Sequence, residues 1–190
     1  MIAGSFTAAF AAPEAGKPAL DFTLKDTAGK EVKLSDYKGK FVVLEWVNFG
    51  CPFVKKHYDS HNMQKLQKEF TDKGVVWLSI CSSAPGKQGN MCPADAAAAA
   101  KALGFSATEY LIDEDGKVGN LYGARTTPEM FVVDPKGDVV YMGAIDDRPS
   151  PDPASLEGAT NYVKTALTEA MAGKPVTTPV TKSYGCSVKY

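Results

Sequence analysis

Short apolar runs alternate with stretches of helical periodicity along most of this 190-residue chain. Runs rich in β-branched and aromatic residues predict strands, and apolar residues that recur every three or four positions predict helices. The predicted strands lie at residues 21–24, 32–34, 42–49, 75–80, 110–112, 129–133 and 139–142. The predicted helices lie at residues 53–71, 93–104 and 155–172, with a helical turn up to Tyr122. Strands that alternate with helices predict an α/β fold, with a central mixed sheet flanked by helices.

Polar turns at residues 26–30 and 134–137 each separate two predicted strands, so we expect two β-hairpins, one of them N-terminal. The chain is 44% hydrophobic and 23% charged, a composition that fits one domain with a sizeable core. The predicted divisions are a flexible arm or signal remnant at residues 1–16, a domain at residues 17–172, and a tail carrying Cys186 at residues 173–190.

The N-terminal segment is small and apolar, and it contains Ala-Phe-Ala just before Pro13. This pattern is typical of the end of a secretory signal with its cleavage site. The basic segment that normally opens such a signal is missing, so a floppy arm is the alternative. We favour export to the periplasm or secretion, with a cytoplasmic protein as the alternative.

Several classes of partner find no support in the composition. A formal net charge of −1 provides no electrostatic basis for binding nucleic acid or an anionic membrane. No apolar run approaches the roughly 20 residues that a membrane-spanning helix needs. Cys51 and His57 alone are too few ligands for a zinc or copper site. We therefore expect no membrane span, no metal and no other cofactor.

Cys51 lies where the apolar central strand gives way to a predicted helix, and Pro52 occupies a favoured first-turn position. The unpaired N–H groups and the positive end of the helix dipole would then face its sulfur and favour the thiolate. This placement makes a cysteine reactive near neutral pH. His57 lies six residues further on, about 9 Å along a helix at roughly 1.5 Å per residue. We therefore expect a partly buried helix histidine rather than a Cys–His pair.

Taken together, the order of elements, Cys51, Glu45 six positions before it and Pro128 before a later strand resemble the thioredoxin fold. The resemblance is to the redoxin branch, which includes thiol–disulfide oxidoreductases and alkyl hydroperoxide reductase/thiol-specific antioxidant proteins, and it covers roughly residues 17–172. It implies a buried Glu45 that relays protons and a cis Pro128 against the active cysteine.

The chain departs from the patterns of this family around Cys51. Val54 stands where thioredoxins carry a second active-site cysteine, so no local resolving thiol exists. Asn48 stands where peroxiredoxins carry a threonine, although its amide could still donate a hydrogen bond. Arg125 is offset from the position of the peroxiredoxin arginine but could supply positive charge. The resemblance thus implies a substrate surface made of Pro52, Asn48, Thr127, Pro128 and Arg125.

Three further cysteines have separate expected roles. Cys81 and Cys92 flank a Ser-, Gly- and Pro-rich loop and could form a structural disulfide, which would contribute roughly 3 kcal/mol in the chain-entropy model. Cys186 lies in the tail among aromatic and apolar residues that suggest a docked segment. We expect it to resolve an oxidised Cys51, with an unreactive thiol as the alternative.

These observations predict a thiol-based oxidoreductase in which Cys51 is the nucleophile, Glu45 handles protons and Cys186 resolves. Its expected partners are protein or small-molecule thiols and disulfides. A thiol peroxidase that reduces hydroperoxides at Cys51 is the alternative enzyme. A binding or redox-sensing module without catalysis is the third possibility. The oligomeric state stays open.

Overall fold

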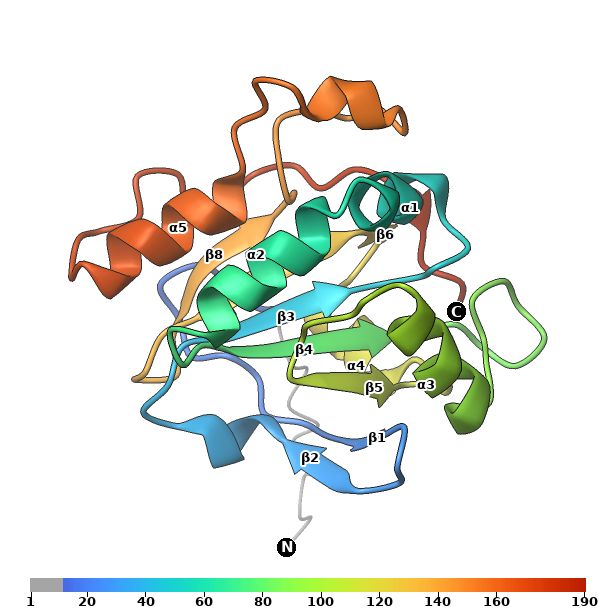
Figure 1. The fold of residues 1–190 in the computed structure, drawn as a ribbon. Helices are drawn as coiled ribbons and strands as arrows, with labels where there is room; N and C mark the ends of the chain where they lie inside the picture. Colours follow the sequence, from blue (N-terminus) through green and yellow to red (C-terminus); the bar gives the residue numbers. More distant parts are fainter. Residues whose placement is uncertain (1–11) are drawn as a thin grey trace, which may run out of the picture.

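The structure, a computed structural model, describes residues 12–190 (Figure 1). Its centre is a seven-stranded mixed sheet with the strand order β2-β1-β5-β4-β3-β7-β8. The strands are β1 (Thr23–Asp26), β2 (Glu31–Lys33), β3 (Val42–Trp46), β4 (Val76–Cys81), β5 (Glu109–Ile112), β7 (Glu129–Val133) and β8 (Val139–Gly143). β3, β4 and β5 run parallel, and the other pairings are antiparallel. A second sheet pairs β6 (Thr126–Thr127) with β9 (Cys186–Ser187).

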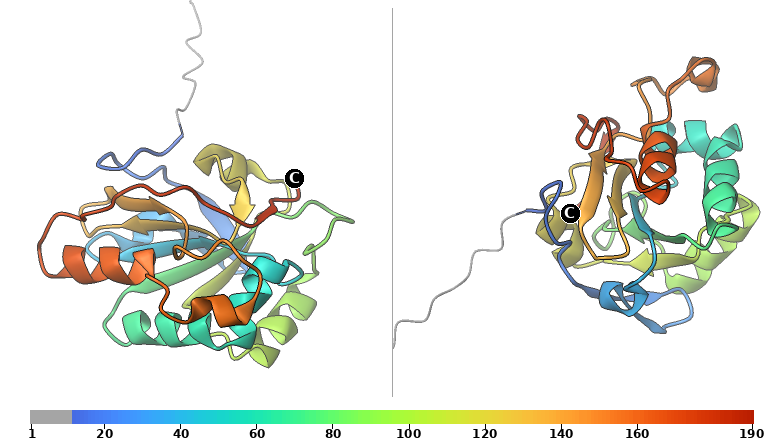
Figure 2. Two further views of the ribbon diagram at one scale, coloured as in Figure 1. Left: turned by 90° about the horizontal axis from the view of Figure 1, so that it is seen from above. Right: turned by 90° about the vertical axis from the view of Figure 1, so that its left-hand side faces the viewer.

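The helices cover both faces of the sheet, as the side view in Figure 2 shows. They are α1 (Pro52–Asp59), α2 (Asn62–Thr71), α3 (Pro93–Ala102), α4 (Lys117–Tyr122) and α5 (Tyr162–Met171), with 3₁₀ turns at Leu34–Tyr37 and Pro153–Leu156. α1, α2, α3 and α5 pack on one face. α4 covers the other face, together with Phe22 and Leu34, which flank the N-terminal hairpin. The predicted α/β class, mixed sheet and two hairpins are confirmed.

β3 is buried along its whole length because both of its faces are covered. Successive side chains on a strand point to opposite faces. Val43 therefore lies in the core under α1 and α2, whereas Leu44 and Trp46 lie in the core on the α4 side. The next residue in this alternation, Glu45, falls on the α1 side, and the chain beyond β3 leads directly to Cys51.

Two predicted helices differ from the structure. The single helix expected at residues 53–71 is broken between α1 and α2, where His61 adopts a left-handed conformation with φ of 58°. Just before this break, the Ser60 hydroxyl donates to the carbonyl of Lys56, 2.6 Å away. The helix expected at residues 155–172 begins later, at Tyr162, because the Asn161 side chain caps it by accepting from the Lys164 N–H.

The tail lacks the periodicity of a helix or strand, yet it is docked along the domain. Its Thr181 N–H donates to the Met142 carbonyl, and the Met142 N–H donates to the Pro179 carbonyl, so it lies along the edge of β8 (Figure 2). It then returns to the α1 side of the molecule, where Cys186 begins β9. Residues 173–190 therefore complete the domain instead of extending from it.

No helix within residues 12–190 is long and apolar enough to cross a membrane. Of the predicted flexible arm or signal remnant at residues 1–16, residues 1–11 lie outside the described residues. The end of this segment is docked, because the Gly16 N–H donates to the Val139 carbonyl at 2.7 Å.

Candidate active site

Cys51 is the N-cap residue of α1, and Pro52 is the first residue of that helix. Its backbone is extended, with φ of −78° and ψ of 127°, so it forms the junction that the sequence predicts. The side chain is fully buried, with 0% exposed surface. Its thiol donates to the Thr127 carbonyl oxygen at 3.2 Å. The Thr127–Pro128 peptide bond is cis, as the resemblance implies.

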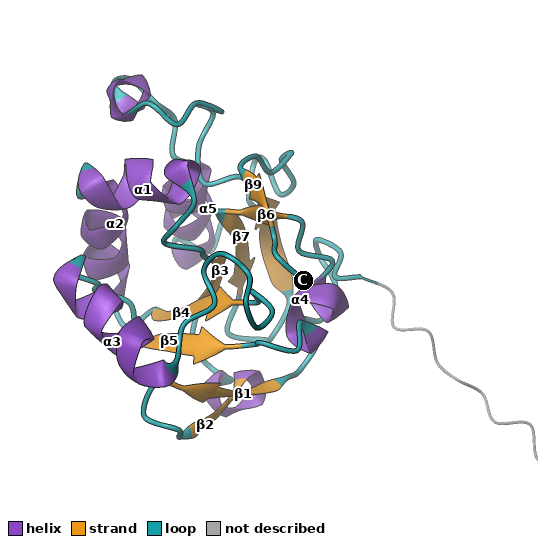
Figure 3. Cartoon of the chain, turned by 90° about the vertical axis from the view of Figure 1, so that its right-hand side faces the viewer, coloured by secondary structure: helices purple, strands orange, loops and turns teal. Residues whose placement is uncertain are grey.

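The tail brings Cys186 to Cys51. β9 pairs antiparallel with β6 so that Cys186 is the register partner of Thr127 (Figure 3). Just before it, Gly185 has φ of 137°, and an added Cβ would overlap the Thr127 carbonyl oxygen. This close approach requires glycine. The Cys186 side chain lies within hydrogen-bonding reach of the Cys51 thiol.

The pKa values of the two thiols are shifted in opposite directions. Burial raises the pKa of Cys51, but hydrogen bonds from Cys186, Thr127 and the Val54 amide outweigh it, so its pKa lies below the ordinary value. Burial and the adjacent Cys51 raise the pKa of Cys186 to about 11. The pair therefore consists of a thiolate-prone Cys51 and a Cys186 that keeps its proton. A thiolate is the form that attacks disulfides and peroxides.

Glu45 is fully buried and saturated with donors. The Ser79 hydroxyl, the Trp77 indole N–H, the Tyr58 hydroxyl and the Gln67 amide donate to it at 2.7, 2.8, 3.0 and 3.1 Å. Burial raises its pKa, and these donors oppose the rise. Within residues 12–190 no hydrogen bond joins Glu45 to Cys51, so the structure shows the buried carboxylate but not the contact that a proton relay needs.

Two predicted substrate residues, Asn48 and Arg125, have other surroundings than Cys51. The Asn48 amide donates to the Gln88 carbonyl at 3.0 Å, and its oxygen accepts from the Gly50 N–H at 2.8 Å, so both of its polar groups are engaged within the loop. Arg125 is exposed, and its backbone carbonyl accepts from the Val188 N–H. Neither side chain has a hydrogen bond with Cys51 in the described part of the chain.

All four cysteines are free thiols. Cys81 is buried and donates to the Gly89 carbonyl at 3.4 Å, whereas the exposed Cys92 accepts from the Asp95 N–H at 3.5 Å. The expected Cys81–Cys92 disulfide is thus not formed in this structure, and it stays a prediction for an oxidising compartment. Among residues 12–190, no three His, Cys, Asp or Glu side chains gather as a metal site.

Lys56, Asp146 and Tyr184 form contacts at this end of the molecule that the sequence pattern does not indicate. Tyr184 donates to the buried Asp146, and Lys56 donates to Tyr184. His57 lies in α1 and is fully buried, whereas the sequence predicted a partly buried helix histidine. The aromatic residues of the tail indicated a docked segment, but the sequence could not identify the partners of Tyr184, because Lys56 and Asp146 lie far from it along the chain.

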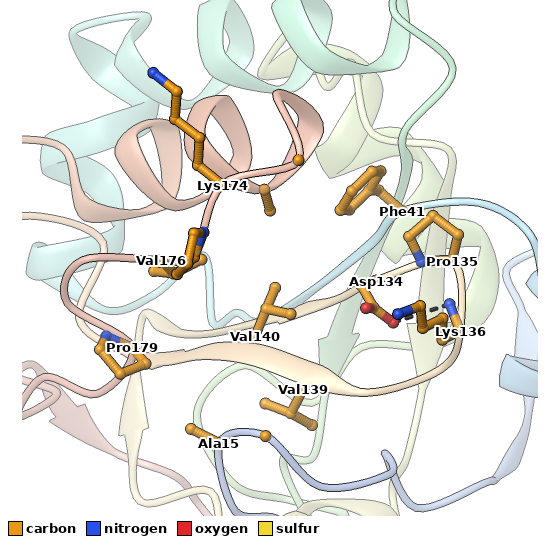
Figure 4. Close-up of a pocket in the computed structure, with 14 residues that line it drawn as sticks. Ala15, Phe41, Asp134, Pro135, Lys136, Val139, Val140, Lys174, Val176 and Pro179 are labelled. Carbon is orange, nitrogen blue, oxygen red and sulfur yellow. Dashed lines mark hydrogen bonds between the residues drawn. The ribbon is translucent and has the colours of Figure 1, made fainter.

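A groove with an apolar lining lies beside the end of α5 (Figure 4). It has a volume of about 680 Å³ between the end of α5 and the β7–β8 turn. Phe41, Val140 and Val176 line it. No cysteine contributes to this groove.

Comparison with known proteins agrees with this geometry. The family model of the AhpC/TSA family matches residues 15–142, more than half of the chain. The chain belongs to the AhpC/TSA family. Its architecture is the thioredoxin-like fold that the resemblance implies. The family match ends before the tail, so it does not include Cys186.

Relatives of two kinds are similar to this AhpC/TSA chain. The thiol-disulfide oxidoreductase ResA of Bacillus subtilis (strain 168) is 31% identical over 142 residues, which cover 72% of this chain and 73% of that protein. Peroxiredoxin-2 of Pongo abelii is 30% identical over 158 residues, which cover 70% and 78%. The crystal structure of an uncharacterized conserved protein from Geobacillus kaustophilus has a TM-score of 0.80 at 30% identity and covers 93% of this chain and 92% of that one.

Proposed function

We propose that the protein is a thiol–disulfide oxidoreductase that uses Cys51 as nucleophile and Cys186 as resolving thiol. The observation that carries this proposal is the placement of Cys186 opposite Thr127, beside the Cys51 thiol. The opposite pKa shifts of the two thiols support it, as does the similarity to ResA. The second active-site cysteine that Val54 replaces in the sequence is thus supplied by the tail.

The cycle has two exchange steps. The Cys51 thiolate attacks one sulfur of a substrate disulfide, the substrate S–S bond breaks, and a mixed disulfide forms while the other substrate thiolate leaves. Cys186 then attacks the Cys51 sulfur, and its proton passes to the second departing thiolate. A Cys51–Cys186 disulfide and two substrate thiols result, and an external dithiol returns the enzyme to its reduced form. Because Cys51 is fully buried, β9 must move for the first attack.

Disulfide mapping tests the proposal. The purified protein is treated with oxidised glutathione, digested without reduction and analysed by mass spectrometry. We expect a Cys51–Cys186 bond, a glutathione adduct retained on Cys51 in Cys186→Ser, and no dithiol-driven disulfide reduction by Cys51→Ser. Turnover of Cys186→Ser at the wild-type rate would remove the resolving role of the tail cysteine.

Peroxidase activity is the second candidate, supported by the similarity to peroxiredoxin-2. The Cys51 thiolate would attack a hydroperoxide, forming a sulfenic acid and releasing an alcohol or water. Cys186 would then condense with the sulfenic acid, with loss of water, to produce the same disulfide. Stopped-flow measurement of peroxide consumption separates the two functions. A protein inert to both peroxides and disulfides would instead be a binding or sensing module.

We also propose the substrate surface, proton route and compartment that follow from this function. Pro52, Thr127 and Pro128 surround Cys51 and would contact the substrate once β9 has moved. Glu45 would act on proton transfer only through a rearrangement of Tyr58, which donates to it from α1. An oxidising, extracytoplasmic compartment is supported by the cysteine content, and mapping of Cys81 and Cys92 in freshly isolated protein tests it.

A further inference from the structure

A buried cluster of charged and polar groups lies between α1, the chain after β8 and the tail. The side chains of Lys56 and Asp146 are 0% and 1% exposed, and the ammonium nitrogen lies 3.8 Å from Oδ2 of the carboxylate. The Tyr184 hydroxyl lies between them: it donates to Oδ1 of Asp146 and accepts from Nζ of Lys56 at 3.2 Å. Tyr184 also packs edge-on against Phe53, with ring centroids 5.9 Å apart.

Lys56 is the counter-ion of Asp146 in this cluster. His57 also lies 3.8 Å from Oδ2, but burial and the charge of Lys56 lower its pKa to about 3, so the imidazole is neutral. Burial lowers the pKa of Lys56, and Asp146 opposes that fall. Burying an ion pair costs desolvation free energy, which makes such a pair weak evidence for a stabilising role. Stability alone therefore does not account for the pair.

The pair contacts the tail only two residues before Cys186. Within residues 12–190, Tyr184 is the tail residue that hydrogen-bonds to Lys56 and Asp146. Between Tyr184 and Cys186 lies only Gly185, whose backbone is held tightly against the Thr127 carbonyl. A fixed Tyr184 therefore restricts where the Cys186 sulfur can lie. β9 has only two residues, so its ladder alone provides few hydrogen bonds.

We propose that the buried Lys56–Asp146 pair is a socket for Tyr184, and that Tyr184 is the residue that positions Cys186 against Cys51. This inference rests on the proposed function and adds a positioning residue to it. Fixing Tyr184 raises the effective concentration of one thiol at the other, so disulfide formation loses less chain entropy. Hydrogen bonds to charged groups are stronger than neutral ones, which suits this anchor.

The test is the redox equilibrium of the cysteine pair in a Cys81→Ser/Cys92→Ser protein. Buffers of reduced and oxidised glutathione set the redox potential. Cys51 and Cys186 lose two electrons and two protons as their S–S bond forms, and one oxidised glutathione is reduced to two thiols. Acid quenching, alkylation and mass spectrometry then measure the oxidised fraction. Tyr184→Phe should lower the equilibrium constant for the disulfide about tenfold, which for this two-electron couple is about 30 mV.

Tyr184→Phe is expected to fold, because both charges keep a partner. The Arg148 N–H donates to Asp146 at 2.9 Å, and the Arg148 carbonyl accepts from Lys56 at 2.8 Å. Tyr190→Phe is the matched control, since it removes a tail hydroxyl that donates to a neutral carbonyl, that of Ala124, at 2.8 Å. Its effect on the equilibrium should be smaller.

A background without the ion pair separates positioning from general stability. In Lys56→Met/Asp146→Asn, the effect of Tyr184→Phe should shrink to less than about threefold, whereas the effect of Tyr190→Phe should stay the same. If the double variant does not fold, as circular dichroism would show, Tyr184→Phe in the parent protein decides alone. An equilibrium constant within twofold of the parent, or an effect that persists without the pair, would overturn the proposal. Absence of any Cys51–Cys186 bond in the parent would instead refute the proposed function.

Discussion

Thr127 presents two groups to Cys51, and each suits a different protonation state of the sulfur. Its carbonyl oxygen accepts from the protonated thiol at 3.2 Å. Its hydroxyl oxygen is buried and has no hydrogen-bond partner within the described residues. A hydroxyl can donate to a thiolate, and this side chain is among the causes that lower the pKa of Cys51. Thr127 can therefore form a hydrogen bond with Cys51 in both protonation states: its carbonyl accepts from the thiol, and its hydroxyl donates to the thiolate.

Replacing that hydroxyl tests its contribution. Thr127→Val keeps the branched shape but removes the donor, so the pKa of Cys51 should rise. The measurement is the alkylation rate against pH in proteins where Cys51 is the only thiol. Thr126→Val is the matched control, because Thr126 Oγ1 makes only long contacts of 3.5 Å, to the Pro128 carbonyl and Glu129. A midpoint that moves equally in both variants would assign the effect to β6 as a whole.

At the scale of elements, the sequence predicted those helices and strands whose formation depends on residues close together in the chain. The buried strands and the position of Cys51 follow from apolar runs that end at Gly50, and α3 begins at Pro93 as its sequence indicates. β6 and β9 have two residues each, too short for any periodicity. Their pairing joins Thr127 to Cys186 across 59 positions and depends on tertiary contacts alone.

The break between α1 and α2 is a second feature that the spacing of apolar residues does not predict. Apolar residues continue at helical spacing on both sides of it, so the pattern predicts one helix. The break depends on one backbone conformation, that of His61, which has a φ of 58°. Left-handed conformations cost roughly 1–2 kcal/mol for most residues. The spacing of apolar residues carries no information about such a conformation at a single residue.

Glycine substitution at the break provides a test. His61→Gly should leave stability unchanged or raise it by up to about 1 kcal/mol, because glycine adopts positive φ without strain. Lys65→Gly is the control, since Lys65 is exposed within α2 and its N–H donates to the His61 carbonyl at 3.1 Å. It should lose about 1 kcal/mol, as glycine does in a helix interior. Urea denaturation measures both, and equal losses would contradict a left-handed His61.

At the scale of the whole molecule, the last seven residues connect elements that are distant in sequence. Tyr184 contacts the cluster beside α1, and Cys186 pairs with β6. Val188 donates to Arg125, and the Lys189 carbonyl accepts from Ala84. At the end, the Tyr190 ring lies against α4. Because this segment holds Cys186 against Thr127, whose carbonyl accepts from the buried Cys51, we expect the docking of the tail to determine how reagents reach the nucleophile.

Gly119 in α4 makes room for the last of these contacts. A Cβ on Gly119 would lie 2.5 Å from the Tyr190 hydroxyl and 2.7 Å from the Ser82 hydroxyl. Glycine to alanine normally stabilises a helix by about 1 kcal/mol. Here Gly119→Ala should instead displace Tyr190, break its 2.8 Å hydrogen bond to the Ala124 carbonyl and loosen the tail.

The measurable consequence is access to Cys51, because a buried thiol reacts only when its cover opens. Iodoacetamide should alkylate Cys51 several-fold faster in Gly119→Ala than in the parent, with Cys81 and Cys92 replaced by serine in both. Tyr190→Ala should produce a similar increase, and adding Gly119→Ala to it should produce little more, since both changes release the same contact. Stability should still fall in the combined variant, because the clash with Ser82 remains. Additive rate increases would mean that Tyr190 and Gly119 act on Cys51 separately, and the tail would not then be the cover of the nucleophile.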